Sequence, residues 1–205
     1  ETVIKKELKR LTGNDAKRPE IEPGTVVRYK VPEFIAFKSP HLQKFLGEIK
    51  VAKFVVTEKG NLKSPDCLVD PRFRHLVDPK KRKGIKLKLG KLEFTFGLGG
   101  MHSTEDCVTY KADKEFKIVD RDVASYYPAV ILNQGLYPEH LTKRFLNVYE
   151  TLVKRRLRAK DTEENRKAGT VNLTEADMLK IVINGSFGKF GSKWSALYSP
   201  DLLIQ

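Results

Sequence analysis

The sequence is poor in the residues that build metal or disulfide sites. Its 205 residues include only two cysteines, Cys67 and Cys107, and four histidines. The cysteines do not form a Cys-x-x-Cys pair, and the histidines lack the spacing of a zinc site. The pattern therefore indicates two idle thiols in a reducing compartment, and not a disulfide framework or a zinc centre.

Long apolar runs are also missing. No run approaches the roughly 20 residues that a membrane-spanning helix needs. Residues 1–12 are charged and have a helical pattern, unlike a signal peptide. We therefore expect no membrane association and a cytoplasmic location. A hydrophobic content of 40% is ordinary for a globular chain, so one large domain or two small ones can form.

Acidic residues are in short supply relative to basic ones. The chain has 39 lysines and arginines against 26 aspartates and glutamates, a formal net charge of +13. This excess favours a polyanionic partner, and nucleic acid is the leading class. An anionic membrane surface fits less well, because no basic amphipathic helix carries bulky aromatic anchors. A merely soluble basic protein is the alternative.

Apolar periodicity predicts an α+β chain. Helical spacing is expected over 1–12, 39–45, 129–133, from Thr142 to 167, and from a Thr174 cap to 187; strands are expected over 25–29, 48–57, 85–96 (as a strand or hairpin) and 117–122. The two long helices should form an antiparallel hairpin.

One basic region precedes the middle of the chain. A cationic cluster consists of Lys80, Lys81, Arg82 and Lys83, and residues 85–96 alternate apolar and cationic side chains. Such a strand face can lie along a phosphate backbone, or it can be a solvated edge guarded by lysines against aggregation. A glycine-rich loop that includes Gly99 and Gly100 follows, and its default interpretation is a turn.

The stretch 117–131 carries the first chemical signal. It predicts a strand that ends on Asp122, then a turn, then a short helix with Pro128 in its first turn. A carboxylate at a strand end, followed by the amides of a helix start, suits a metal ion that carries a phosphate group.

The second signal lies in the last long helix. Lys180, Asn184 and Phe187 have helical spacing, so they share one face, and Gly188 follows the ring. An ammonium, an amide, a ring and a bare glycine suit a ligand with phosphates at one end and a flat base at the other. An ordinary surface face with a half-buried Phe is the alternative.

Together these stretches resemble family B DNA polymerases of the compact bacteriophage kind. Asp122 to Pro128 is similar to the first palm motif, D-x-x-S-L-Y-P. Lys180 to Gly188 is similar to the fingers motif, K-x-x-x-N-S-x-Y-G, and the Gly99–Gly100 loop to the Y-x-G-G element. The three occur in the family's order, with a basic helix between the last two, and they cover about half the chain.

The resemblance implies roles for the residues around Asp122. Asp122 would ligate two catalytic Mg²⁺ ions, and Val123 would add its carbonyl to one of them. Ser125 and Tyr126 would give backbone amides to the triphosphate of a dNTP. Tyr127 would pack under the sugar and exclude a 2′-hydroxyl.

It also implies roles for the helical hairpin. Lys180 would bind the incoming phosphates and protonate pyrophosphate, and Asn184, Phe187 and Gly188 would line the nucleotide pocket. Arg156 and Lys160 have the i, i+4 spacing of the phosphate-binding pair, with Arg155 as a close alternative. Primer-template DNA would lie on the Gly99–Gly100 loop and on the cluster of Lys80, Lys81, Arg82 and Lys83.

The sequence departs from the family pattern in several places. Tyr126 replaces Leu, which is harmless because the selector Tyr127 remains, whereas Gly185 replaces Ser and Phe187 replaces Tyr, and the loss of that hydroxyl near the base pair puts fidelity in doubt. The second palm motif, Y-x-D-T-D-S, and the exonuclease carboxylates are absent. We therefore expect the central part of a polymerase, inactive alone, whose exonuclease and C-terminal palm and thumb lie elsewhere. The expected parts are a connector over 1–96, a partial palm over 97–140, a fingers hairpin over 141–191 and a return over 192–205.

Two other functions fit parts of the sequence. Asp120 and Asp122 form a D-x-D that could hold a metal and a diphosphate, as in nucleotide-sugar glycosyltransferases. Alternatively, the chain is a non-catalytic nucleic-acid-binding module. In that case the basic helix and the lysine cluster bind the nucleic acid, and Asp122 caps a turn.

Overall fold

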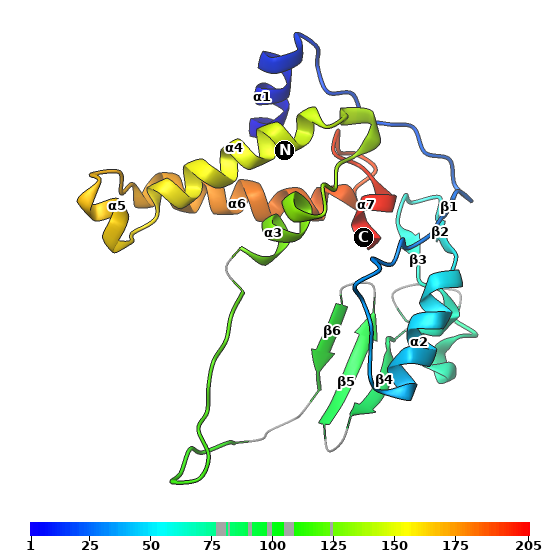
Figure 1. Ribbon diagram of the computed structural model, residues 1–205. Coiled ribbons are helices and arrows are strands. Elements are labelled where there is room, and N and C mark those ends of the chain that lie inside the picture. Colours follow the sequence, from blue (N-terminus) through cyan, green and yellow to red (C-terminus); the bar gives the residue numbers. More distant parts are fainter. Residues whose placement is uncertain (77–80, 82, 90–91, 98–99, 105–108, 124) are drawn as a thin grey trace. The chain divides into compact units, whose positions relative to one another are not determined.

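The protein combines helices with two small three-stranded sheets, as the α+β prediction requires. The structure is a computed structural model that describes residues 1–76, 81, 83–89, 92–97, 100–104, 109–123 and 125–205 (Figure 1). It divides into two compact units. The helical unit comprises Glu1–Val27, Val56–Leu62 and Ser125–Gln205; the sheet unit comprises Arg28–Val55 and Lys63–Ala124.

Two long helices form the centre of the helical unit. Helices α4 (Arg144–Ala159) and α6 (Leu173–Phe190) pack side by side and antiparallel, with the short α5 (Glu163–Lys167) at the tip (Figure 1). Helix α1 (Thr2–Thr12) packs on α4, and α7 (Pro200–Ile204) packs on α6. The short α3 (Tyr126–Asn133) contacts both α4 and α6.

The core of this unit follows the helical repeat of α4. Phe145, Tyr149 and Leu152 point to one side of the helix and are essentially fully buried. The Phe145 ring stacks on Tyr149 and meets Phe190 of α6 edge-on, with centroids 5.4 and 5.9 Å away. Burying each such side chain stabilises the fold by about 1.5–3 kcal/mol.

A buried hydrogen bond joins the same two helices. The Tyr149 hydroxyl donates to the carbonyl oxygen of Ile183 at 3.3 Å. Burial raises the pKa of Tyr149 to about 12, so the phenol stays neutral and keeps its proton for this bond.

The hairpin differs from its sequence prediction in two places. The helix expected to continue to 167 instead ends at Ala159. The Asn165 side-chain amide stabilises this break, because its nitrogen donates hydrogen bonds to the carbonyl oxygens of Leu157 and Lys160, at 2.8 Å each. The expected Thr174 cap was wrong. The Asn172 side chain caps α6 instead, accepting a hydrogen bond from the Glu175 amide at 3.0 Å.

The sheet unit is built around a three-stranded antiparallel sheet. It has the order β4 (Ile85–Leu89), β5 (Leu92–Gly97) and β6 (Gly100–Ser103), so of the two forms predicted over 85–96, a strand or a hairpin, the hairpin is the one observed. Helix α2 (Pro40–Val51) places Phe45 edge-on against Phe96 of β5, with centroids 5.1 Å apart. The α2 helix runs further than the predicted 39–45, which leaves a strand only at β2 (Phe54–Val56). The second sheet has the order β1 (Val26–Val27), β2 and β3 (Leu62–Lys63).

A buried carboxylate stabilises a turn of the sheet unit by hydrogen bonds. Asp70 is buried and accepts hydrogen bonds from the Arg72 amide at 3.0 Å and from the Arg72 guanidinium at 2.7 Å. These bonds from Arg72 lower the pKa of Asp70 to about 2. The Asp70 amide in turn donates to the Lys83 carbonyl at 3.0 Å, which ties this turn to the start of β4.

The strand predicted over 117–122 was wrong. This segment is irregular, and its apolar residues Ile118 and Val119 are exposed. A strand needs a neighbour for its backbone hydrogen bonds, and neither sheet in the described ranges includes this segment. None of the helices in those ranges combines the length and apolar character that crossing a bilayer requires.

Candidate functional site

The helix α3 begins on a strained residue. Ser125 has φ 54° and ψ 49°, the left-handed conformation that non-glycine residues rarely adopt. Such strain persists only where surrounding contacts hold it, and it gathers at functional positions. The Ser125 side chain makes no cap for α3, so its hydroxyl is free to contact another element.

That hydroxyl meets an arginine of α4. The Nη1 atom of Arg156 donates to Ser125 Oγ at 3.0 Å. The Nε atom of Arg156 is buried and has no hydrogen-bond partner among the described residues. A buried N–H without an acceptor is costly. The guanidinium of Arg156 is therefore suited to take a further acceptor, such as an anionic oxygen.

The neighbouring arginine is already engaged. The Nη2 atom of Arg155 lies 2.6 Å from Glu175 Oε1 of α6, in an ion pair on the outside of the hairpin. This distinguishes the two arginines that the sequence left as alternatives. Lys160 is the C-cap of α4, and its amide donates to the Arg156 carbonyl oxygen at 3.1 Å, so it lies one helical turn beyond Arg156 before the chain leaves the helix.

An aromatic row runs from α3 into α6. The ring of Tyr127 stacks on Phe187 with centroids 4.5 Å apart and planes inclined by 29°. Tyr126 meets Tyr127 edge-on at 5.7 Å, and Phe187 meets the buried Phe190 at 6.1 Å. Phe187 is half-buried, whereas both tyrosines are exposed. The row thus extends from exposed rings at the surface to a buried ring in the core of the hairpin.

The other predicted residues of α6 lie in the open. Lys180, Asn184 and Gly188 are all exposed and stand one helical turn apart. Together with Phe187 they give α6 a face with an ammonium, an amide and a ring edge. The site residues that the structure brings together are therefore Ser125, Tyr126, Tyr127, Arg156 and Phe187, with Lys180, Asn184 and Gly188 along the same helix as Phe187.

The predicted metal ligands lie in the sheet unit. Asp122 and Val123 are exposed, in the irregular segment that follows β6. Among the residues that the structure describes, no three His, Cys, Asp or Glu side chains gather as a metal site. One exposed carboxylate and one carbonyl do not make up the donor set of a two-metal centre. The described part of the chain thus supplies, at most, part of such a site.

The expected DNA-binding residues are described only in part. Gly99, Lys80 and Arg82 lie outside the described residues. Gly100 starts β6 with φ +106°, a conformation that glycine accommodates. Lys81 and Lys83 are exposed, and the Lys83 ammonium lies 5.2 Å from the centroid of the Phe73 ring.

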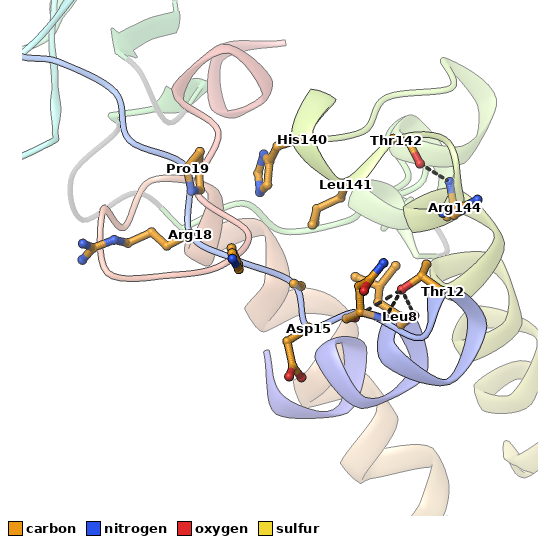
Figure 2. A pocket seen from close by; sticks show the side chains of 12 residues that line it. Leu8, Thr12, Asp15, Arg18, Pro19, His140, Leu141, Thr142 and Arg144 are labelled. Atoms are coloured by element: carbon orange, nitrogen blue, oxygen red, sulfur yellow. Dashed lines mark hydrogen bonds between the residues drawn. The ribbon is translucent and has the colours of Figure 1, made fainter.

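A separate cavity of about 610 Å³ lies elsewhere on the helical unit (Figure 2). Its walls come from the end of α1 with the loop after it, and from the segment around His140. Thr142 at its edge has φ 57° and ψ −177°, and the His140 Nε2 atom lies 2.8 Å from the Ala196 carbonyl oxygen. No sequence motif indicated this cavity, because its lining comes from segments far apart in the chain.

Comparisons with known proteins were negative: no protein-family model, no curated protein and no solved structure matches this chain.

Proposed function

We propose that this chain forms the nucleotide-binding front of a family B DNA polymerase, a DNA-directed enzyme that adds dNTPs to a primer 3′-end. The observation that supports this most strongly is the stack of Tyr127 on Phe187 at 4.5 Å. It joins the D-x-x-S-Y-Y-P helix α3 to the K-x-x-x-N-G-S-F-G helix α6. In the family that the sequence resembles, these two motifs share the incoming nucleotide.

The same contact region offers groups for a triphosphate. Arg156 carries a buried Nε–H without a partner among the described residues, and its guanidinium geometry suits phosphate oxygens. Lys180 adds an exposed ammonium one turn before Asn184. The amides at the start of α3, at Ser125 and Tyr126, suit an anion as well. The rings of Tyr127 and Phe187 would then face the sugar and the base pair.

Magnesium and DNA complete the proposal. Asp122 and Val123 would contribute ligands to Mg²⁺. When bound, this ion would neutralise negative charge on the phosphates. The further carboxylates that it needs must come from outside the described residues. Primer-template DNA would lie on the basic cluster that includes Lys81 and Lys83 and on the loop of Gly100, attracted by the net positive charge of the chain. The exonuclease and C-terminal palm and thumb regions of such a polymerase would be partners. We place the protein in the cytoplasm, that of a bacterial host if it is phage-encoded.

Nucleotide binding tests the proposal. We expect dTTP to bind the chain more tightly with Mg²⁺ than without it, and Asp122→Ala and Lys180→Ala each to weaken binding. Isothermal titration calorimetry measures this, and Lys167→Ala at the tip of the hairpin is the matched control, because Lys167 forms an ion pair with Glu163 on the same short helix α5. Equal affinity with and without Mg²⁺ would favour a non-catalytic nucleic-acid-binding module. Primer extension by this chain alone, lost on Asp122→Ala, would contradict the inactivity that we expect of it.

The glycosyltransferase alternative receives no support from the geometry. It requires Asp120 and Asp122 on one face of a strand, and the segment 117–122 is irregular and exposed. Turnover of a sugar nucleotide without any affinity for DNA would reinstate it.

A further inference from the structure

The only tryptophan of the chain is unusually exposed. Trp194 lies between α6 and α7, and 75% of its surface is open to solvent. A large aromatic side chain left in water forgoes the burial that such side chains usually gain. Two cations flank it: Arg18 Cζ lies 5.3 Å from the ring centroid and Lys193 Nζ lies 5.2 Å from it. Both distances are in the range of cation–π contacts.

Two hydrogen bonds to the turn at 58–60 hold the segment that carries Trp194 in place. The Lys193 ammonium donates to the carbonyl oxygen of Glu58 at 2.8 Å, and the Tyr198 hydroxyl donates to the carbonyl oxygen of Gly60 at 2.8 Å. Gly60 has φ +76°, and a Cβ atom there would lie 2.5 Å from Lys193 Cβ. The Lys193 side chain thus lies directly on the Gly60 turn, and the tryptophan stands on a preorganised support.

A hollow of about 260 Å³ adjoins the indole. Its walls include Arg18, Lys193, Trp194 and the buried Tyr198, and two carboxylates, Glu20 and Glu22, also border it. The larger cavity shares the residues Arg18 and Pro19 with this hollow. Figure 2 shows the Arg18 side chain directed away from His140 and Leu141. Its guanidinium instead lies over the Trp194 ring.

An exposed flat ring with fixed cations beside it suits single-stranded nucleic acid. Every nucleobase has a flat face that can stack on an aromatic side chain, and neighbouring cations meet the phosphates that follow. Carboxylates such as Glu20 and Glu22 can accept hydrogen bonds from the amino groups or the ring N–H groups of bases. The formal net charge of +13 provides long-range attraction for a polyanion.

We propose that Trp194, Arg18 and Lys193 form a stacking site for single-stranded nucleic acid. The site shares no residue with the aromatic row of Tyr127 and Phe187 or with Arg156. It goes beyond the proposed function and does not depend on it: nucleotide binding at Arg156 could fail while strand binding at Trp194 persists, or the reverse.

The single tryptophan makes a direct test available. Stacking of a base on an indole quenches its fluorescence, and with excitation beyond the absorption of the seven tyrosines the signal comes from Trp194, the single tryptophan of the sequence. The probe is an oligothymidylate of about eight nucleotides, within the usual length of a single-strand site. We expect saturable quenching by this probe, and much weaker quenching by an abasic oligonucleotide of equal phosphate number, by a duplex of the same length and by free dTTP.

Substitutions separate stacking from charge. With a labelled oligothymidylate and fluorescence anisotropy, we expect Trp194→Ala to weaken binding about tenfold and Trp194→Phe to weaken it less. Arg18→Gln and Lys193→Gln should each weaken oligothymidylate binding at least about threefold, and neither should make binding more dependent on salt. Lys167→Gln, which removes the same charge at the tip of the hairpin, should not weaken binding. Circular dichroism checks that each variant is folded; as Trp194 is exposed, its substitutions should leave the fold intact.

Several results would overturn the proposal. Equal quenching by the abasic and the base-bearing oligonucleotide would mean that no base stacks on Trp194. Equal quenching by free dTTP would replace a strand site with a mononucleotide site. Absence of quenching, whether or not the oligonucleotide binds elsewhere on the chain, would remove the site altogether.

Discussion

Tyr127 and Phe187 stack ring on ring, with centroids 4.5 Å apart, although they belong to different helices and to distant parts of the sequence. The contact fastens α3 to the α4–α6 hairpin beside a second link, the hydrogen bond from Arg156 to Ser125. Aromatic pairs of this geometry contribute free energy beyond the area that they bury. The stack is therefore both a structural joint and the best candidate for a surface that meets a nucleotide.

We predict that these two rings are energetically coupled. A double-mutant cycle with Tyr127→Ala, Phe187→Ala and the double variant should give a coupling free energy of about 0.5–1.5 kcal/mol in urea unfolding. Phe187→Tyr, which restores the residue usual in the resembled family, should keep the coupling. Tyr126→Ala paired with Phe187→Ala serves as the control, because no ring contact joins Tyr126 directly to Phe187 among the described residues. Strict additivity for the Tyr127 cycle would refute the stack.

The start of α6 gives a second prediction. Asn172→Ala should lower the free energy of unfolding by about 1 kcal/mol, because the Asn172 side chain accepts the Glu175 amide hydrogen bond. Thr174→Ala should have a much smaller effect, since Thr174 is exposed and lies inside the helix. Chemical denaturation of both variants measures the difference. A larger loss for Thr174→Ala would restore the cap that the sequence suggested.

Acid sensitivity of the sheet unit gives a third prediction. The pKa of Asp70 is lowered to about 2 by hydrogen bonds from Arg72, against about 3.9 for an unperturbed Asp. A lowered pKa means that the folded state binds the proton more weakly than the unfolded state. The contribution of Asp70 to stability is then full above about pH 4, falls between about pH 4 and 2, and is absent below.

Asp70→Asn should accordingly be less stable than the unmodified chain at pH 7, with a difference that shrinks as the pH falls to about 2. Circular dichroism during denaturation at each pH measures this. Asp113→Asn is the control, since an Asn side-chain oxygen can still accept the hydrogen bonds from the Glu115 and Phe116 amides, both 2.8 Å long. A stability difference for Asp70→Asn that does not change with pH would contradict the assignment.

Sequence reasoning worked best where local patterns decide the structure. The helix over 1–12 forms as α1 and ends at Gly13, whose φ of +72° glycine adopts more readily than residues with a side chain. The alternation over 85–96 forms a hairpin, and the apolar spacing around Phe145 and Tyr149 forms a buried helix face. These features depend on neighbours a few residues away, which the sequence displays directly.

Sequence reasoning failed where residues far away in the chain determine the local structure. Residues 117–122 have the composition of a strand, but a strand exists only if another segment pairs with it. The choice between Arg155 and Arg156 depended on Glu175 and Ser125, which lie on other helices. The surroundings of Trp194 were missed for the same reason, since Arg18 and Gly60 reach it from far along the chain.

The most direct test of the central claim compares the two adjacent arginines of α4 in dTTP binding. Arg156 offers a buried Nε–H that has no partner in the described ranges, whereas Arg155 is held by Glu175, and Arg156→Gln and Arg155→Gln remove the same charge. By titration calorimetry with Mg²⁺, we predict that Arg156→Gln weakens dTTP binding about tenfold or more, while Arg155→Gln changes it by no more than about twofold. Equal losses for the two variants, or no dTTP binding by the unmodified chain, would contradict the account.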